Sequence, residues 1–355
     1  MYMRFDGIGI TGLAAVVPEH VIDNLTPPEN FTRAEADAVV KMTGIRFRRR
    51  VPASMCASDL CFSAAQRLLE EMDVDRKAID ALIFVSHSPD YRKPATSPLL
   101  QARLGLSMGT AAIDINLGCS GYVYGLAVAY SMVANSEVRK LLLLNGESIT
   151  RSVSQRDKTT GLLFGDSGTA TLLEKTANAG SSVFSLFSDG GRGQMIMAPA
   201  GGYRNPSSES TVVERRYQDG SIRSEEHTVM DGAGVFSFII SDVYKDIAEV
   251  LARTKSDPSS IDYFVFHQAN RFATEHLRKK LKISSDKVPY SLDEFGNTSG
   301  PSIPLTMVTR LASALRQRRL NLLLAGFGVG LSWGTAVLAT DRVHVCDLVE
   351  VGEAS

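Results

Sequence analysis

Cysteine is scarce in this sequence, and the few cysteines present form no pattern typical of zinc binding or of a disulfide framework. Only four of the 355 residues are cysteine, and no two of them make a C-x-x-C pair. We therefore expect neither a disulfide-stapled miniprotein nor a metal cluster, and we expect a reducing, cytoplasmic compartment. The first six residues carry charges where a secretory signal needs an apolar run, so no signal peptide is expected.

An excess of charge of either sign is also missing. The chain has 38 Lys and Arg against 39 Asp and Glu, a net charge of −1. Because the net charge creates no strong positive electrostatic field, neither nucleic acid nor an anionic membrane is an expected partner. Two uncharged stretches, 116–136 and 321–340, have the length of a membrane span, but glycine and polar residues interrupt both. We expect them to be buried parts of a soluble core.

The order of apolar runs indicates two similar halves. Each half has a helical pattern, then a short β-rich run, then a leucine-rich strand ending in glycine: 58–72, 79–85 and 141–146, and again 235–253, 261–266 and 322–326. The β-rich run and the leucine strand start 62 residues apart in the first half (79 to 141) and 61 in the second (261 to 322). Apolar strands between helices predict an α/β fold with sheets covered on both faces.

These observations predict an internal duplication with halves at 1–178 and 179–355. The segment 190–223 between them is polar and rich in Gly, Pro, Ser and Arg, which is typical of a long surface excursion. A further helix is expected at 34–41.

The strongest local motif surrounds Cys119. A β-type run ends near Asn116, Gly118 allows a tight turn, and a helix rich in small residues follows. Cys119 is therefore predicted at a strand–turn–helix junction, where the positive end of a helix favours the thiolate. Two interpretations remain open on this motif alone: a nucleophile, or a small buried hydrophobic residue.

Two other polar residues stand in distinctive settings. His267 directly follows a buried strand, which suits a proton donor or acceptor but equally a core histidine satisfied by backbone. Asn297 lies in a loop enclosed by glycine and proline, Gly296 to Pro304. Its amide can donate to a developing oxyanion, although an ordinary turn asparagine has the same pattern.

The glycine-dense segment 326–334 would let the backbone approach a ligand closely. It does not match a phosphate-binding loop, because neither a helix signal nor a Lys-Ser/Thr pair follows it.

Taken together, these motifs resemble the β-ketoacyl-acyl-carrier-protein synthase III group of the thiolase superfamily. Cys119, His-Gln-Ala-Asn at 267–270 and Gly-Asn-Thr-Ser at 296–299 occur in the family order. The resemblance extends from Gly7-Ile-Gly-Ile-Thr-Gly12 through Phe164-Gly-Asp-Ser-Gly168 to Gly334. It implies a five-layered αβαβα fold built by internal duplication, and a homodimer.

The resemblance also implies a reaction. Cys119 would take an acyl group from an acyl-CoA or acyl-carrier-protein thioester. His267 and Asn297 would then assist decarboxylation of a malonyl thioester, most simply malonyl-carrier protein, and the carbanion would attack the acyl-Cys119. The backbone N–H groups of Cys119 and Val329 would form the oxyanion hole. No bound metal or redox cofactor is implied.

Departures from the family pattern concern substrate recognition. The aromatic and arginine positions that help hold the coenzyme A nucleotide fall on Ala38 and Met42, and a further arginine position falls near Lys158. Standard acetyl-CoA recognition is therefore not expected to carry over unchanged. We place Phe327 in the acyl pocket. Lys93 falls at the family position that closes the acyl pocket of the neighbouring subunit, and a lysine there hints at an unusual or polar acyl chain.

Basic residues could serve an acidic carrier protein. Arg46 belongs to a run of arginines at 46–50, and a second group follows His267 on a predicted helix. We expect contacts to the carrier protein or coenzyme A from Arg46, Lys158, Asn270, Arg271, Lys279 and Lys280; a solvated charged face is the alternative.

Two other functions stay open. The acyl group on Cys119 could pass to an alcohol or amine, because a fold does not fix a reaction. Alternatively, the chain could be a non-catalytic subunit that shapes a partner's pocket, although the retained cysteine argues against this.

Overall fold

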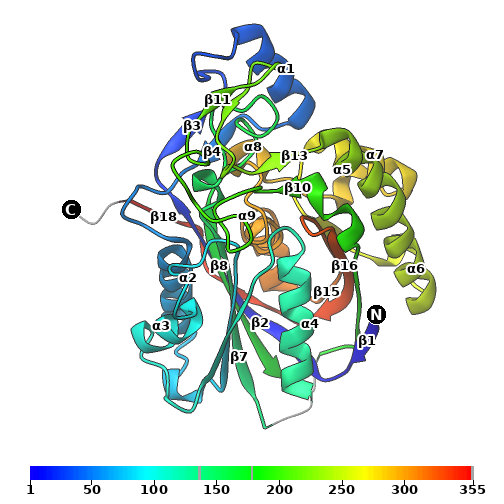
Figure 1. The fold of residues 1–355 in the computed structure, drawn as a ribbon. Helices are drawn as coiled ribbons and strands as arrows, with labels where there is room; N and C mark the ends of the chain where they lie inside the picture. The colour runs from blue at the N-terminus through cyan, green and yellow to red at the C-terminus, as the bar shows by residue number, and fades with distance from the viewer. Residues whose placement is uncertain (135–136, 177–178, 353–355) are drawn as a thin grey trace.

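Two mixed sheets with helices between them and outside them organise the chain (Figure 1). The computed structural model describes residues 1–134, 137–176 and 179–352. The first sheet has the order β17-β2-β8-β7-β5-β6, with β18 also paired to β2. Its strands are β2 (Ile8–Pro18), β5 (Ala81–Val85), β6 (Ala111–Ile115), β7 (Lys140–Glu147), β8 (Ser167–Lys175), β17 (His344–Val345) and β18 (Val349–Val351).

The second sheet has the order β1-β9-β16-β15-β14. Its strands are β1 (Tyr2–Phe5), β9 (Ser182–Ser188), β14 (Tyr263–Phe266), β15 (Leu320–Gly328) and β16 (Ser332–Thr340). The chain ends are exchanged between the sheets, because β1 pairs with β9 while β17 and β18 pair with β2. The predicted boundary at 178 falls on residues outside the described part of the chain, so the division into halves stays a prediction.

The two sheets repeat one pairing scheme. In the first, β5 pairs parallel to β7, and β7 and β2 both pair antiparallel to β8. In the second, β14 pairs parallel to β15, and β15 and β9 both pair antiparallel to β16. The parallel pairs have nearly the same sequence offset, since Ala81 faces Leu141 and Tyr263 faces Leu322. The spacing that predicted a duplication therefore reflects equivalent strand pairs.

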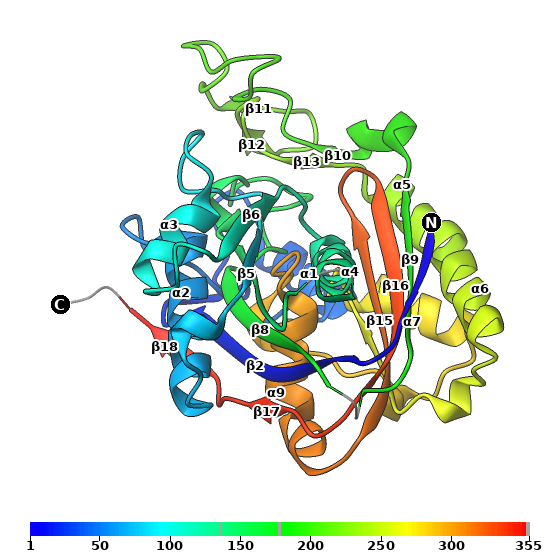
Figure 2. The same cartoon turned by 90° about the horizontal axis from the view of Figure 1, so that it is seen from below.

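Five layers result, as Figure 2 shows. One outer layer holds α2 (Ala57–Glu71) and α3 (Thr96–Arg103) against the first sheet, and the other includes α6 (Tyr244–Thr254) against β9 and β16. Between the sheets lie α4 (Gly121–Ala134) and α9 (Ser302–Gln317). The central apolar cluster joins these two helices to both sheets, through residues such as Tyr122, Leu143, Leu305 and Leu324. The expected αβαβα arrangement is confirmed.

Most predicted helices are present with small shifts. The segment 34–41 is α1 (Arg33–Thr43), which begins at a capping box in which the Thr32 side chain accepts from the Glu35 N–H. The segment 58–72 is α2. The segment 235–253 is composite: α5 (Gly232–Phe238), a π-helical turn (Ile239–Val243) and then α6. The remaining helices are α7 (Arg271–Lys280) and the short α8 (Leu292–Phe295).

The long uncharged stretches are interior elements. The first contains α4, and the second forms the β15–β16 hairpin. Residues 135–136, at the end of the first stretch, lie outside the described part. Among the described helices, none has both the length and the apolar character required to cross a bilayer.

The polar excursion is a small domain-like arm built from two ribbons. β10 (Ile196–Met197) pairs with β13 (Val229–Met230), and β11 (Arg215–Arg216) pairs with β12 (Ile222–Arg223). We call residues 196–230 the 196–230 arm; it projects from the body in Figure 2. A further ribbon, β3 (Val21–Asp23) with β4 (Phe47–Arg49), lies near α1.

Candidate active site

The predicted strand–turn–helix junction positions Cys119. β6 ends at Ile115, and α4 begins at Gly121, two residues after the cysteine. Glycine suits position 118, because a Cβ there would lie 2.8 Å from Nδ1 of His87 and 3.0 Å from Oγ of Ser299, and these side chains would have to shift. Cys119 is only 8% exposed, and its side chain lines a cavity of about 1040 Å³.

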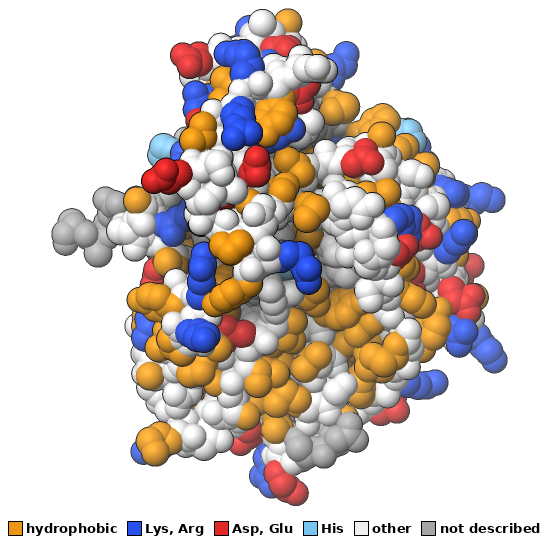
Figure 3. All heavy atoms as spheres, viewed as in Figure 1, with side chains coloured by type: hydrophobic (Ala, Val, Ile, Leu, Met, Phe, Trp, Pro, Cys, Tyr) orange, Lys and Arg blue, Asp and Glu red, His pale blue; other side chains and the backbone are white. Residues whose placement is uncertain are grey.

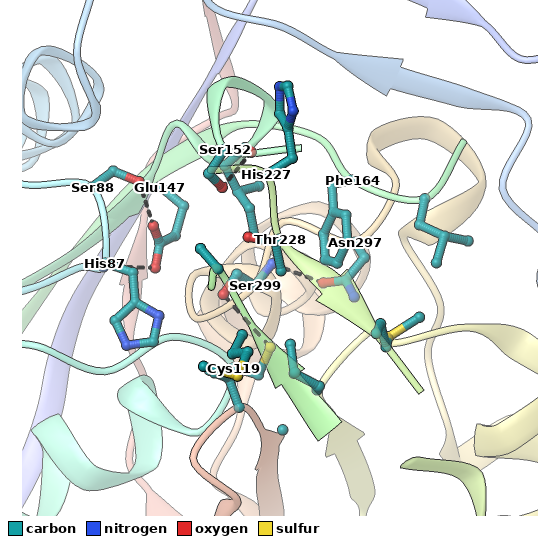
Figure 4. Close-up of a pocket in the computed structure, with 18 of the residues that line it drawn as sticks. His87, Ser88, Cys119, Glu147, Ser152, Phe164, His227, Thr228, Asn297 and Ser299 are labelled. Carbon is teal, nitrogen blue, oxygen red and sulfur yellow. Dashed lines mark hydrogen bonds between the residues drawn. The ribbon is translucent and has the colours of Figure 1, made fainter. Parts of the chain in front are cut away.

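The three predicted catalytic residues line this one cavity, although they are far apart in the sequence. Cys119 comes from the first half of the chain, and His267 and Asn297 come from the second. The helices α4 and α9, which occupy equivalent places between the sheets, both begin beside the cavity. Figure 4 shows Ser299 between Cys119 and Asn297, with an interaction to each.

His267 is held at the end of β14. Its backbone N–H donates to the carbonyl of Ala325 at 2.8 Å, and its Nδ1 lies 2.8 Å from Oγ of Ser302. The ring meets the Phe327 ring edge-on, with centroids 5.5 Å apart. Burial lowers the pKa of His267 to about 3, against a hydrogen bond with the Ser299 backbone that acts to raise it. The imidazole is therefore neutral at physiological pH.

Asn297 is fixed through both its backbone and its side chain. It bridges to Phe164 of the other half: its N–H donates to the carbonyl of Leu163 at 2.9 Å, and its carbonyl accepts from Gly165 at 3.1 Å. Its side-chain Oδ1 accepts from the Ser299 N–H at 2.9 Å (Figure 4). With the oxygen engaged in this way, the amide nitrogen is the end available to donate to another molecule.

Ser299 was not singled out from the sequence, although it belongs to the 296–299 motif. Its backbone has φ of +60°, which is uncommon for a residue other than glycine. This conformation brings its Oγ to 3.6 Å from Sγ of Cys119 while its N–H holds Asn297. Ser299 thus connects the Cys119 side chain to the Asn297 side chain.

The glycine-dense hairpin packs directly against Cys119 and Ser120. A Cβ at Gly328 would lie 2.5 Å from Cβ of Cys119, and a Cβ at Gly326 would lie 3.0 Å from Cα of Ser120. Val329 follows directly and lines the cavity. Among the described residues other than glycine, positive φ is recorded at four positions, and Val329 is not one of them, so its β-branched side chain is unstrained here.

The expectation that the helix end favours the thiolate of Cys119 requires correction for the free protein. Burial raises the pKa of the Cys119 thiol above its ordinary value, and this effect outweighs the hydrogen bonds from Ser299, from the Val329 backbone and from its own backbone. In the free protein the Cys119 side chain is therefore a thiol at neutral pH. A thiolate formed during reaction would find those donors in position.

Sequence reasoning missed a polar wall of the cavity. Glu147, at the end of β7, is fully buried and accepts from the His87 N–H at 3.0 Å and from Oγ of Ser88 at 2.7 Å (Figure 4). Burial raises the pKa of Glu147 to about 8, so its carboxyl is largely protonated at neutral pH. His87 and Ser88 lie just after β5, and Glu147 ends β7. Because β5 and β7 are parallel neighbours, these residues meet at the same edge of the sheet.

The 196–230 arm supplies another wall of the cavity, so the prediction of a purely surface segment is only partly correct. Its tip is exposed, but its base lines the cavity with Ile196, Met197, Thr228 and Met230. Phe327 lines the same cavity and is buried, as predicted for the acyl pocket. Lys93 is exposed and lies outside the lining of its own chain's cavity; its place against a neighbour's pocket stays a prediction.

The predicted carrier and coenzyme A contacts divide into two groups. Asn270 lines the cavity and caps α7, accepting from the Ala273 N–H at 2.8 Å. Arg271, Lys279 and Lys280 are exposed on the same helix. Lys280 also donates to the carbonyl of Ile240 at 2.7 Å.

Arg46 and Lys158 lie outside the cavity lining and already have partners. Arg46 pairs with Asp23 at 2.7 Å, and Lys158 pairs with Glu35 at 2.8 Å. Arg48, in the same run as Arg46, is buried and donates to Asn24 at 2.7 Å, so the run at 46–50 is not a uniform basic face. Whether Arg46 and Lys158 contact a substrate stays a prediction.

One group of metal-type ligands lies away from the cavity. Atoms of Glu71, His344 and Cys346 lie within 4.8 Å of one another. Glu71 is hydrogen-bonded to Nε2 of His344 at 3.0 Å and is ion-paired with Arg67. The Glu71 carboxylate is therefore already engaged by neighbouring side chains.

Comparisons with known proteins show which family the chain resembles. The family model described as 3-oxoacyl-[acyl-carrier-protein (ACP)] synthase III matches residues 113–190, and its C-terminal counterpart matches residues 251–340. A putative 3-oxoacyl-[acyl-carrier-protein] synthase 3 of Campylobacter jejuni is 34% identical, over 95% of each chain. A β-ketoacyl-[acyl-carrier-protein] synthase III of Caldanaerobacter subterraneus is 33% identical, over 93% of this chain and 97% of the relative.

A solved structure is similarly close. The 3-oxoacyl-(acyl-carrier protein) synthase of Burkholderia xenovorans LB400 superposes with a TM-score of 0.93 at 37% identity, over 99% of each chain. Sequence identity above 30% over nearly the whole chain indicates a common family and not only a common fold. The chain therefore belongs to the 3-oxoacyl-acyl-carrier-protein synthase III family of the thiolase superfamily, and it is a condensing enzyme of the acyltransferase type.

Proposed function

We propose that Cys119 is the nucleophile that receives the starter acyl group. Its sulfur attacks the thioester carbonyl, the carbonyl–sulfur bond of the donor breaks, and the thiol proton leaves with the departing thiolate. The products are acyl-Cys119 and the free carrier thiol. Ser299 Oγ, 3.6 Å from Sγ, and the Val329 backbone stabilise negative charge on the sulfur.

We propose that a malonyl thioester then loses CO₂ beside His267 and Asn297. The electron pair of the broken carbon–carbon bond moves into the thioester as an enolate. A ring N–H of His267 and the Asn297 amide donate to the enolate oxygen, where the charge develops. Because the His267 pKa is about 3, the donor is a neutral imidazole whose state does not change near pH 7.

The enolate carbon next attacks the acyl carbonyl on Cys119. A carbon–carbon bond forms, the bond from carbonyl to Sγ breaks, and the product is a 3-oxoacyl thioester on the extender's carrier. The Cys119 thiolate then takes a proton from solvent. The backbone N–H groups of Cys119 and Val329 serve the tetrahedral oxyanion.

One observation carries this proposal: the orientation of Asn297. Its Oδ1 is occupied by the Ser299 N–H, so its amide nitrogen is free to donate in the cavity that Cys119 and His267 also line. Simple acyl transfer from Cys119 needs one oxyanion hole only. A second pair of donors, away from the sulfur, has a purpose when a second carbonyl must carry charge, as in decarboxylation.

The substrates are proposed as an acyl-CoA or acyl-carrier-protein thioester for loading and malonyl-acyl-carrier protein for extension. Arg271, Lys279 and Lys280 are exposed on α7, which begins at the cavity residue Asn270, and would meet an acidic carrier protein there. Every proposed step uses side chains, backbone and the two thioesters, so the proposal calls for no bound cofactor.

We also propose a cytoplasmic homodimer. The four cysteines are free thiols, as suits a reducing compartment. β6 is the edge strand of the first sheet and leaves Ile113 39% exposed. Hydrophobic side chains gather over α4 and its surroundings on the face drawn in Figure 3. An exposed sheet edge beside an apolar surface favours association with a second copy.

Intact-protein mass spectrometry tests the proposal. Wild type and Cys119→Ala are incubated with a panel of acyl-CoA and acyl-carrier-protein thioesters, and malonyl-carrier protein is then added. We expect an adduct on wild type only, discharged with release of CO₂ and formation of a 3-oxoacyl product. Discharge only onto alcohols or amines would refute condensation. The absence of any adduct on wild type across the panel would refute Cys119 as the nucleophile.

A further inference from the structure

The inner side of the His267 ring faces the first residue of α9. Nδ1 of His267 lies 2.8 Å from Oγ of Ser302. Both residues are 1% exposed. A hydrogen bond therefore joins the two groups in a place that water does not reach, and its direction decides which ring nitrogen carries the proton.

Other contacts of the Ser302 hydroxyl fix that direction. The backbone N–H of Gln268 points at the same Oγ, at 3.3 Å. An N–H group can only donate, so Oγ accepts from Gln268. Among the described residues, these are the two hydrogen bonds recorded for Ser302 Oγ, and His267 Nδ1 is the one partner able to accept. The hydroxyl proton therefore points to Nδ1.

The opposite arrangement would leave a group unsatisfied. If Nδ1 carried the proton, Oγ of Ser302 would receive two N–H donors, and its own buried proton would have no acceptor among the recorded contacts. A doubly protonated ring is also disfavoured, because burial lowers the pKa of His267 to about 3. One tautomer, with the proton on Nε2, satisfies both the Ser302 hydroxyl and Nδ1.

We propose that Ser302 is a positioning residue that locks His267 in the Nε2–H tautomer, so that the imidazole can only donate to the malonyl thioester oxygen. This assignment rests on the proposed function for its catalytic consequence, although the tautomer itself does not. Ser302 touches no substrate in this account. It acts through His267, by occupying the lone pair of Nδ1.

The decisive experiment is ¹⁵N NMR of the histidine-labelled protein, which distinguishes a protonated from an unprotonated ring nitrogen. The chain has six histidines, and a His267→Gln spectrum identifies the signals of interest. Wild type should show an unprotonated Nδ1 and a protonated Nε2 from pH 5 to 8. Ser302→Ala should move His267 toward the other tautomer or a mixture, and Ser302→Thr, which keeps the hydroxyl, should restore the wild-type pattern.

A kinetic measurement accompanies the spectra. In single turnovers, Ser302→Ala should slow CO₂ release about tenfold, which is the rate effect expected when one hydrogen bond to His267 is lost. Loading of Cys119 should stay within about twofold of wild type. The matched control is Ser291→Ala. Ser291 is equally buried, and its Oγ contacts Thr306 on the same helix at 2.7 Å without contacting His267.

Clear results would overturn the assignment. A wild-type His267 protonated on Nδ1 would do so, and so would a Ser302→Ala variant with an unchanged tautomer and unchanged CO₂ release. Equal effects of Ser302→Ala and Ser291→Ala would reduce Ser302 to a structural role. If wild type has the Nε2–H tautomer yet releases no CO₂ from any malonyl thioester, the proposed function fails while the tautomer assignment stands.

Discussion

Replacing Gly328 with alanine should displace Cys119, the proposed nucleophile. A Cβ at position 328 would lie 2.5 Å from Cβ and 2.9 Å from Sγ of Cys119. Carbon atoms in contact normally stay about 3.5–4.0 Å apart, so something must move by about 1 Å. β15 cannot easily retreat, because it is paired on one side with β14 and on the other with β16, where Gly328 faces Ser332.

The displacement should damage activity more than stability. Overpacking of this kind costs about 1–3 kcal/mol of folding free energy. A reacting group misplaced by about 1 Å can lose about 100-fold in rate. The assay is single-turnover loading of Cys119, followed by intact mass, with the Tm measured in parallel. Gly190→Ala is the matched control, because a Cβ there meets no atom within 4 Å.

A particular outcome would refute this reasoning. If Gly328→Ala loads Cys119 at the wild-type rate while keeping a wild-type Tm, the close approach of the hairpin to the sulfur is not part of the site. If Gly190→Ala loses as much loading as Gly328→Ala, the effect is not specific to the nucleophile.

Further predictions concern charge and pH. Because burial lowers the pKa of His267 to about 3, the unfolded chain binds a proton there below about pH 6.5 that the native chain does not, so stability falls on acidification. Wild type should lose about 2 kcal/mol more than His267→Gln between pH 7 and pH 5 in urea titrations, and equal losses would contradict the shift. Because burial raises the pKa of Cys119, its alkylation by iodoacetamide should still be rising above pH 9, with no plateau near pH 8. Ser299→Ala should slow that alkylation several-fold by removing a donor to the thiolate; an unchanged rate would exclude the contact. Lys279→Glu should raise KM for an acyl-carrier-protein substrate at low salt but not for the matching acyl-CoA, and equal changes would remove α7 from the docking face.

Local sequence patterns were enough to predict the site residues that directly follow the end of a strand. Cys119 was predicted from a strand, a glycine and a small-residue helix, and that junction is present. His267 was predicted from a buried strand that stops just before it. The duplication was predicted from two leucine strands at matching distances, because equivalent strand pairs impose equal spacing.

Residues brought in by long-range packing could not be predicted in the same way. The wall formed by Met197 and Met230 comes from a polar, glycine-rich segment whose pattern indicates only an exposed loop. The contact of Ser302 with His267 depends on how α9 starts relative to β14, which no local pattern encodes. The raised pKa of Cys119 likewise follows from burial by the β15–β16 hairpin, about 200 residues further along the chain, rather than from the helix that follows it.

CO₂ release from a malonyl thioester by enzyme already acylated on Cys119 tests the central claim most directly. Asn297→Asp keeps the shape of the side chain but removes its amide donor. We expect this variant to load Cys119 at close to the wild-type rate and to release CO₂ about 100-fold more slowly, a loss typical of a missing oxyanion donor. CO₂ release within about twofold of wild type, with loading intact, would contradict the claim that Asn297 assists decarboxylation.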